Sequence, residues 1–124
     1  MTNASRLLNG IRVLVAEDET LIAELIMDML SSMGAETIGP ASTVDEIISA
    51  VAGDPPDAVT LDVNLRGEFV YRAIPAIQQR KIPFIFVTAY PFLPDCPAAL
   101  GKVPRVQKPF RAVELAAAFE KLLN

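Results

Sequence analysis

The stretch Ala58-Val59-Thr60-Leu61-Asp62-Val63-Asn64-Leu65-Arg66-Gly67 decides the predicted fold, because it is an apolar run that ends in a carboxylate and a polar turn. Such a run is typical of a buried strand, with Asp62 at its carboxyl end. In open α/β sheets, ligands bind at the edge formed by the carboxyl ends of the strands. An acid at this position is more often a loop residue or a helix cap than a reacting group, so the rest of the chain decides its meaning.

The chain on both sides of this stretch alternates between short apolar runs and segments whose apolar residues recur at helical spacing. Thr43 and Glu46 fit a capping box, Gly34 fits a helix end, and Pro75 should kink the third helix or mark a late start. Four prolines within residues 91–104 argue against a regular helix there. Strands are predicted at residues 11–16, 35–39, 58–62, 82–87 and 103–107, and helices at 20–33, 43–52, 67–80 and 111–123.

Five strands that alternate with helices predict an α/β fold with a parallel sheet and helices on both faces, since parallel strands need crossover connections. The carboxyl ends of all strands then lie along one edge. Polar residues follow four of these strands: Glu17 and Asp18 after the first, Asp62 after the third, Thr88 after the fourth and Lys108 after the fifth. We therefore expect three carboxylates, a hydroxyl and an ammonium group to share one site.

This set of side chains favours a divalent cation and phosphoryl chemistry. Crowded carboxylates either raise a pKa or bind a cation, and oxygen ligands favour Mg²⁺. The ion would neutralise an incoming phosphoryl group, and Asp62 could then attack it as a nucleophile. Lys108 could contact one phosphoryl oxygen, and Thr88 could donate a hydrogen bond to another. Singly, these residues are more often turn or surface residues, but all of them in this order is hard to obtain by chance.

The composition excludes several other classes of protein. The chain has 124 residues and a net charge of −4, and its 11 basic residues are scattered, so it lacks the basic patch of a nucleic-acid-binding protein. Without histidine there is no imidazole catalysis and no histidine-bound zinc. The single Cys96 and the lack of a membrane-spanning apolar run predict a reduced, cytoplasmic protein with no membrane partner.

The order of these motifs resembles the receiver domain of bacterial two-component response regulators. The resemblance rests on the acid pair Glu17-Asp18, the D-x-N-L motif at Asp62, the T-A motif at Thr88 and the K-P-F motif at Lys108. It covers the chain from about residue 11 to its end. It implies a flavodoxin-like (βα)5 doubly wound sheet of order 2-1-3-4-5 in a single domain, 1–124, with a core at about 11–123 and a short or irregular fourth helix.

The resemblance also implies a role for each residue of the site. Asp62 corresponds to the phosphoacceptor, and Glu17 and Asp18 to acids that bind Mg²⁺. Asn64 corresponds to a residue that lends its backbone carbonyl to the ion. Thr88 and Lys108 correspond to groups that contact the phosphoryl oxygens, the lysine commonly being followed by a cis proline.

As a family, receivers take the phosphoryl group from a sensor histidine kinase or a phosphotransfer protein, change conformation and later hydrolyse the acyl phosphate. We expect a signalling phosphoacceptor rather than an enzyme. Its output would be contacts with a downstream protein or the draining of phosphoryl groups from a kinase, and a weak homodimer is possible.

Some positions depart from the family pattern. Arg105 stands where receivers carry a rotating tyrosine or phenylalanine, and Arg66 stands where proline is usual. The segment 83–90 is similar to a variant group of single-domain receivers from alphaproteobacteria, which are often served by atypical histidine kinases. Tyr90, two residues after Thr88, is either a packing residue of its loop or a shield that keeps water from the acyl phosphate.

Three other interpretations compete with a phosphorylated receiver. A flavodoxin-like electron carrier would share the fold, but Glu17-Asp18-Glu19 would repel the cofactor's phosphate. A phosphatase of the haloacid dehalogenase type would need a second acid where the chain has Asn64, and its nucleophile follows the first strand. The third alternative is a receiver-shaped scaffold that regulates partners without phosphorylation.

Overall fold

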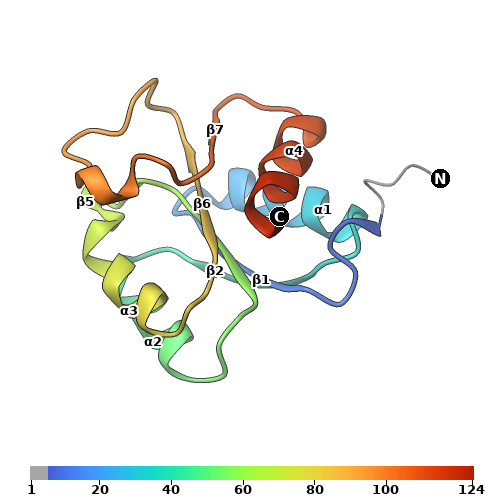
Figure 1. Ribbon diagram of the computed structural model, residues 1–124, viewed down its shortest axis with the longest axis horizontal. Coiled ribbons are helices and arrows are strands. Elements are labelled where there is room, and N and C mark those ends of the chain that lie inside the picture. The colour runs from blue at the N-terminus through green and yellow to red at the C-terminus, as the bar shows by residue number, and fades with distance from the viewer. Residues whose placement is uncertain (1–5) are drawn as a thin grey trace.

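The computed structural model describes residues 6–124, so residues 1–5 of the expected domain lie outside the described residues. Five parallel strands form one sheet in the order β2-β1-β3-β6-β7, as the sequence predicts (Figure 1). The strands of this sheet are β1 (Arg12–Ala16), β2 (Glu36–Ala41), β3 (Ala58–Leu61), β6 (Phe84–Thr88) and β7 (Arg105–Gln107). The helices are α1 (Thr20–Ser32), α2 (Val44–Ala52), α3 (Ile74–Gln79) and α4 (Ala112–Leu123).

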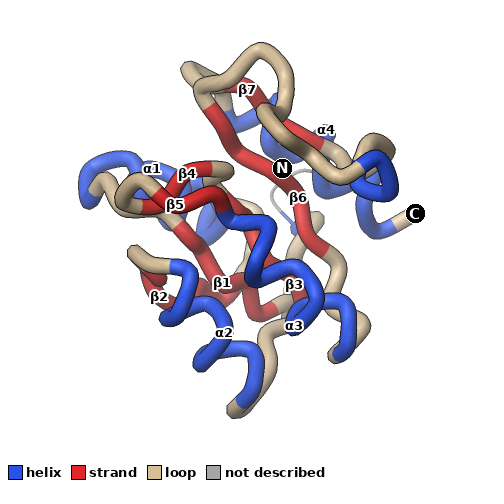
Figure 2. Tube along the Cα trace, turned by 90° about the vertical axis from the view of Figure 1, so that its left-hand side faces the viewer, coloured by secondary structure: helices blue, strands red, loops and turns tan. Residues whose placement is uncertain are grey.

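Two layers of helices cover the sheet, with α2 and α3 on one face and α1 and α4 on the other (Figure 2). Side chains alternate between the faces along each strand. On β1, Leu14 and Ala16 belong to the core under α2 and α3, whereas Val13 and Val15 belong to the core under α1 and α4. The three central strands are almost entirely buried, which explains their continuous apolar runs.

Local signals at the helix ends behave largely as predicted. Gly34 follows the end of α1 and has a φ of +97°. This left-handed conformation, which glycine adopts freely, ends the helix. The Glu46 amide donates to Thr43 Oγ1 at 3.1 Å, which caps α2. The Glu46 carboxylate accepts from the Ser42 amide instead of the Thr43 amide, so the predicted box is shifted by one residue on that side.

The predicted start of the third helix near Gly67 is wrong. The chain there forms a hairpin of β4 (Asn64–Leu65) and β5 (Glu68–Phe69). Arg66 and Gly67 make its turn with φ values of +52° and +87°, which turn the chain back before a helix can start. A short 3-10 helix follows, and α3 begins at Ile74 with Pro75 in its first turn, where proline is tolerated. Pro75 therefore marks a late start.

The proline-rich segment after β6 contains only a three-residue 3-10 helix, Ala98–Leu100, which confirms the predicted irregular fourth helix. The Tyr71 hydroxyl donates to the Pro94 carbonyl at 2.7 Å, and the Tyr71 ring meets Phe86 edge to face. This contact fastens the segment to the α3 side of the sheet. Within residues 6–124, none of the helices has the length and apolar character that crossing a membrane requires.

Candidate functional site

The sheet register brings Glu17 and Asp62 together. Ala16 pairs with Leu61 in the ladder between β1 and β3, so the next residue of each strand reaches the same edge. The Asp62 amide donates to the Ala16 carbonyl at 3.0 Å, which fixes the two chain ends side by side. Carboxylate oxygens of Glu17, Asp18 and Asp62 all lie within 4.8 Å of one another. The predicted acidic cluster is therefore present in the fold.

Lys108 reaches this cluster from the end of β7. Its Nζ atom lies 2.5 Å from Glu17 Oε1 and 3.1 Å from Asp62 Oδ2, so one ammonium group bridges two carboxylates. The Lys108 amide donates to the Thr88 carbonyl at 2.7 Å, and the peptide bond to Pro109 is cis. These contacts hold the lysine stem at the same edge as the acids.

Burial and charge shift the acid and base strengths in this cluster. Glu17 is 1% exposed, and burial raises its pKa to about 7 even though the hydrogen bond from Lys108 opposes the rise. Burial also opposes the charged form of Lys108, but its hydrogen bond to Glu17 and the charge of Asp62 outweigh burial and raise the lysine pKa. The site therefore retains a cation next to two acids, one of which holds its proton up to near-neutral pH.

The hairpin missed from the sequence contacts Asp18. The Arg66 amide donates to Asp18 Oδ2 at 2.9 Å. Partial burial opposes ionisation of Asp18, but this hydrogen bond and its neighbours outweigh burial and lower the pKa of the carboxyl. The sequence signal for this turn is an asparagine three residues before a glycine, Asn64 and Gly67. In the structure the Gly67 amide donates a hydrogen bond to Asn64 Oδ1 at 2.9 Å.

Thr88 and Asn64 also lie at this edge. Thr88 is fully buried at the end of β6, and its Oγ1 accepts a hydrogen bond from the Tyr90 amide at 3.1 Å. The Asn64 amide approaches Asp62 Oδ1 at 3.3 Å, which places the Asn64 backbone directly beside the central carboxylate. The Tyr90 side chain is 36% exposed on the loop that leaves β6.

The donor set suits a hard divalent cation. The acidic cluster offers only oxygen ligands, and its three carboxyl groups outnumber the one lysine ammonium beside them. Asp62 remains slightly accessible at 9% exposure and Asp18 is half-buried, so an ion can reach them from solvent. The residues present therefore fit a magnesium ion.

Comparison with known proteins matches this geometry to one family. The pattern described as "Response regulator receiver domain" covers residues 13–120. The chain belongs to the receiver domain family of response regulators. The family assignment favours a receiver over the flavodoxin-like carrier and the haloacid dehalogenase type of phosphatase, and receiver domains are signalling proteins.

Individual relatives of this receiver domain extend the comparison. The response regulator PhyR from Brucella abortus has a TM-score of 0.81 and 32% identity, over 98% of this chain and 50% of PhyR. SdrG from Sphingomonas melonis Fr1 has a TM-score of 0.81 and 34% identity, over 95% of this chain and 98% of SdrG. The transcriptional regulatory protein PdtaR from Mycobacterium tuberculosis is 31% identical over 88% of this chain and 55% of its own length. The receiver thus spans about half the length of PdtaR.

Proposed function

We propose that this receiver domain accepts a phosphoryl group on Asp62, with Mg²⁺ present, from the phosphohistidine of a sensor kinase or a phosphotransfer protein. The observation that supports the proposal is the meeting of three carboxylates within 4.8 Å of one another, with the Lys108 ammonium 3.1 Å from Asp62. Structural arrangements alone rarely retain such a cluster, because desolvating like charges together is costly. A cluster of this kind is typical of a site that handles charged groups.

The proposed transfer is a displacement at phosphorus. One Asp62 oxygen bonds to phosphorus as the P–N bond of the phosphohistidine breaks, and the imidazole leaves with that electron pair. Hydrolysis later forms a bond from a water oxygen to phosphorus and breaks the bond to Asp62, which releases inorganic phosphate and regenerates the carboxylate. Bound Mg²⁺ would supply positive charge opposite the phosphoryl oxygens. Glu17, Asp18, Asp62 and the Asn64 carbonyl would hold it.

Lys108 and Thr88 would bind the oxygens of the phosphoryl group. Lys108 already contacts the Asp62 carboxylate, so its ammonium needs little movement to pair with a phosphoryl oxygen on that residue. The Thr88 hydroxyl can donate to another oxygen. Charge-assisted hydrogen bonds contribute roughly 1.5–3 kcal/mol each, so two of them supply about 3–6 kcal/mol. A shift from 1:99 to 99:1 between two states needs about 5.5 kcal/mol, so these contacts suffice for a switch.

The phosphodonor would dock beside α1. Leu21 is 80% exposed and Leu25 is 48% exposed on this helix. Next to them lies an apolar hollow of about 430 Å³ whose walls include Ile22, Leu25, Ala89, Pro109 and Phe110, together with Lys108. A donor histidine has to approach Asp62 from this edge, and exposed apolar groups of this kind mark protein contacts. Leu21→Ser should weaken transfer from a phosphorylated phosphotransfer domain and leave labelling by acetyl phosphate unchanged.

The test of the proposed function is labelling with acetyl phosphate and Mg²⁺, followed by intact mass spectrometry. We expect one added phosphoryl group, lost in Asp62→Asn and prevented by chelation of the metal. Asp28→Asn, a change of an exposed acid on α1, is the matched control and should be labelled like the wild type. An unlabelled wild-type protein would refute the proposal and favour the scaffold that regulates partners without phosphorylation.

A further inference from the structure

The hairpin of β4 and β5 places backbone amides against two of the three acids of the site. It begins two residues after Asp62, and its two strands stand apart from the five-stranded sheet (Figure 2). The Asn64 amide approaches Asp62 Oδ1 at 3.3 Å, and the Arg66 amide donates to Asp18 Oδ2 at 2.9 Å. The second bond joins residues 48 positions apart in the chain, so it depends on how the fold holds the hairpin.

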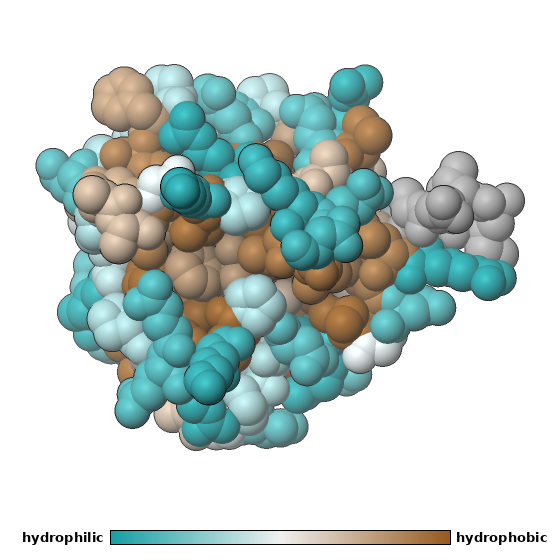
Figure 3. Space-filling model, in the orientation of Figure 1, coloured by the Kyte–Doolittle hydropathy of each residue, from teal (hydrophilic) through white to brown (hydrophobic). Residues whose placement is uncertain are grey.

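Apolar residues fasten this hairpin to the core. Leu65, Val63 and Val70 are enclosed almost completely, whereas other hydrophobic residues come to the surface between hydrophilic side chains on the face shown in Figure 3. The Val70 amide donates to the Val63 carbonyl at 2.8 Å, which closes the base of the hairpin. The Arg66 amide is therefore presented to Asp18 from a turn whose two ends are fixed in the core.

The hydrogen-bond donor to Asp18 exists because residue 66 is not proline. Proline, the usual residue at this position in receivers, has no N–H group, and its ring holds φ at about −65°. Arg66 has a φ of +52° and Gly67 a φ of +87°, and positive values at both central residues are typical of a two-residue hairpin turn. The Gly67 amide also donates to Asn64 Oδ1 at 2.9 Å, which braces the turn. The departure at position 66 therefore supplies both the turn and an N–H group at the acidic site.

The hydrogen bond from Arg66 leaves Asp18 able to bind an ion. A carboxylate has two oxygens, so the amide can occupy Oδ2 while Oδ1 stays available. Partial burial opposes ionisation of Asp18, yet the pKa of its carboxyl lies below the ordinary value, and the Arg66 amide is the main contact that lowers it. In metal sites, groups that hydrogen-bond to a ligand fix its orientation, and losing such a group typically costs about 10- to 100-fold in metal affinity.

We propose that the Arg66 backbone amide is a positioning group that holds the Asp18 carboxylate in the orientation in which it binds Mg²⁺. The ion then meets a side chain that is already ordered, so less conformational freedom is lost on binding. The Arg66 guanidinium has no part in this role, since it is exposed and makes no ion pair with any of residues 6–124. The inference deepens the proposed function and rests on its Mg²⁺ site, but not on phosphoryl transfer.

The experiment removes the N–H group of Arg66 and keeps its side chain. In protein assembled by peptide ligation, an ester replaces the amide bond between Leu65 and Arg66, and the Kd for Mg²⁺ is measured by NMR titration at constant pH. We expect this Kd to rise about tenfold or more. Arg66→Gly keeps the N–H group and the positive φ, so its Kd should stay within about twofold of the wild type. In the metal-free protein, the Arg66 amide proton should resonate downfield and should lose this shift in Asp18→Ala.

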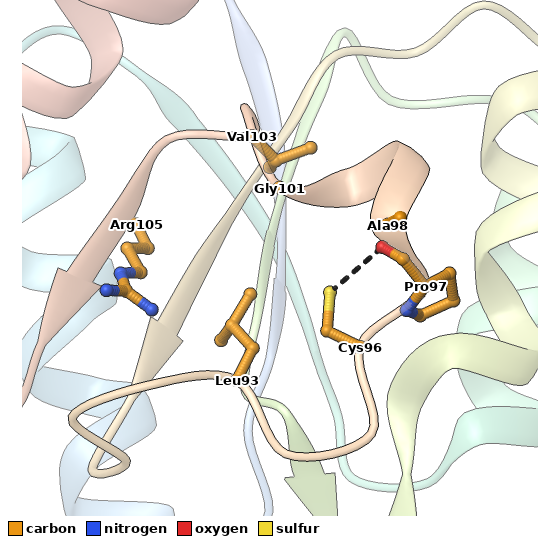
Figure 4. Close-up of a pocket in the computed structure, with 7 residues that line it drawn as sticks. All are labelled: Leu93, Cys96, Pro97, Ala98, Gly101, Val103 and Arg105. Carbon is orange, nitrogen blue, oxygen red and sulfur yellow. Dashed lines mark hydrogen bonds between the residues drawn. The ribbon is translucent and has the colours of Figure 1, made fainter.

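Two matched controls separate positioning from charge and from stability. Arg105 lies beside a cleft of about 310 Å³ with Leu93 and Val103 (Figure 4), and Arg105→Gln removes the same charge as Arg66→Gly without changing the Kd. Gly67 and Gly10 both have positive φ and open space for a Cβ atom, so alanine strains both turns without a clash. The two alanine variants should lose similar stability in urea, whereas only Gly67→Ala should raise the Kd for Mg²⁺ several-fold.

Several outcomes would overturn the inference. Equal Mg²⁺ affinity of the ester and wild-type proteins would do so, and tighter binding by the ester would show that the amide competes with the ion for Asp18. A tenfold loss in Arg66→Gly would assign the effect to the guanidinium group instead. A wild-type protein that binds no Mg²⁺ would overturn the metal site of the proposed function as well. Labelling of Asp62 by acetyl phosphate tests phosphoryl transfer separately, because the inference concerns the metal affinity alone.

Discussion

Replacing Lys108 by methionine should destabilise the metal-free protein, and more so as the pH rises. Lys108 is the ammonium group that bridges Glu17 and Asp62, at 2.5 and 3.1 Å. Methionine keeps much of the side-chain length but removes the charge. Removing one member of a buried ion pair costs about 3–5 kcal/mol, because its partner is left uncompensated. We expect a loss of this size at pH 8.

The pH dependence follows from the Glu17 carboxyl. In the folded protein its pKa is about 7, against an ordinary value of 4.5, so the folded state binds this proton more tightly than the unfolded state. Wild-type stability should therefore fall by as much as about 3 kcal/mol as the pH rises from 4.5 to 7 and then level off. Without Lys108 the pKa rises further, so the fall continues above pH 7. At pH 5.5 Glu17 is protonated in both proteins, and the variant should lose less than about 2 kcal/mol.

The assay is urea unfolding followed by circular dichroism in the presence of a chelator, at pH 5.5 and at pH 8. A loss of 3–5 kcal/mol corresponds to a midpoint about 2 M lower, given slopes of roughly 1–3 kcal/mol per M. Lys102→Met removes an exposed lysine that makes no ion pair with the described residues, and it should change stability by less than about 0.5 kcal/mol. A Lys108→Met variant with the same loss at both pH values would refute the proposed coupling to Glu17.

Three further predictions follow from the same structure. Thr60→Val should raise stability by about 1 kcal/mol in thermal unfolding, because the Thr60 hydroxyl is buried without a partner among the described residues; a lower melting temperature would contradict this. Mg²⁺ at about 100 times its Kd should raise the free energy of unfolding of the wild type by about 2.7 kcal/mol. The same rise in Asp18→Asn would show that Asp18 is not a ligand of the ion. Tyr90→Ala should shorten the lifetime of the acyl phosphate several-fold by admitting water, whereas Phe92→Ala, at 69% exposure, should not. An unchanged dephosphorylation rate in Tyr90→Ala would make Tyr90 a packing residue only.

The sequence predicted the sheet and the site because both depend on repeated local signals. Apolar runs set the strands, and register then required Glu17, Asp62 and Lys108 to meet at one edge. The hairpin at Arg66 escaped prediction because an arginine with positive φ is uncommon and its turn is fixed by contacts from elsewhere, notably Asp18. No periodic pattern records a contact between residues so far apart in the chain.

The edge strand β7 adjoins the proposed phosphorylation site at one of its ends. Lys108 follows the last residue of this strand and contacts Asp62, while Arg105 begins the strand and is exposed. Three residues of extended chain span roughly 10 Å, and the β7 backbone pairs with β6 on one side only. A movement of the Lys108 ammonium toward a phosphoryl group would therefore pull on the strand that positions Arg105. Position 105 carries no aromatic side chain, so the side chain that such a shift would move is the exposed Arg105 guanidinium.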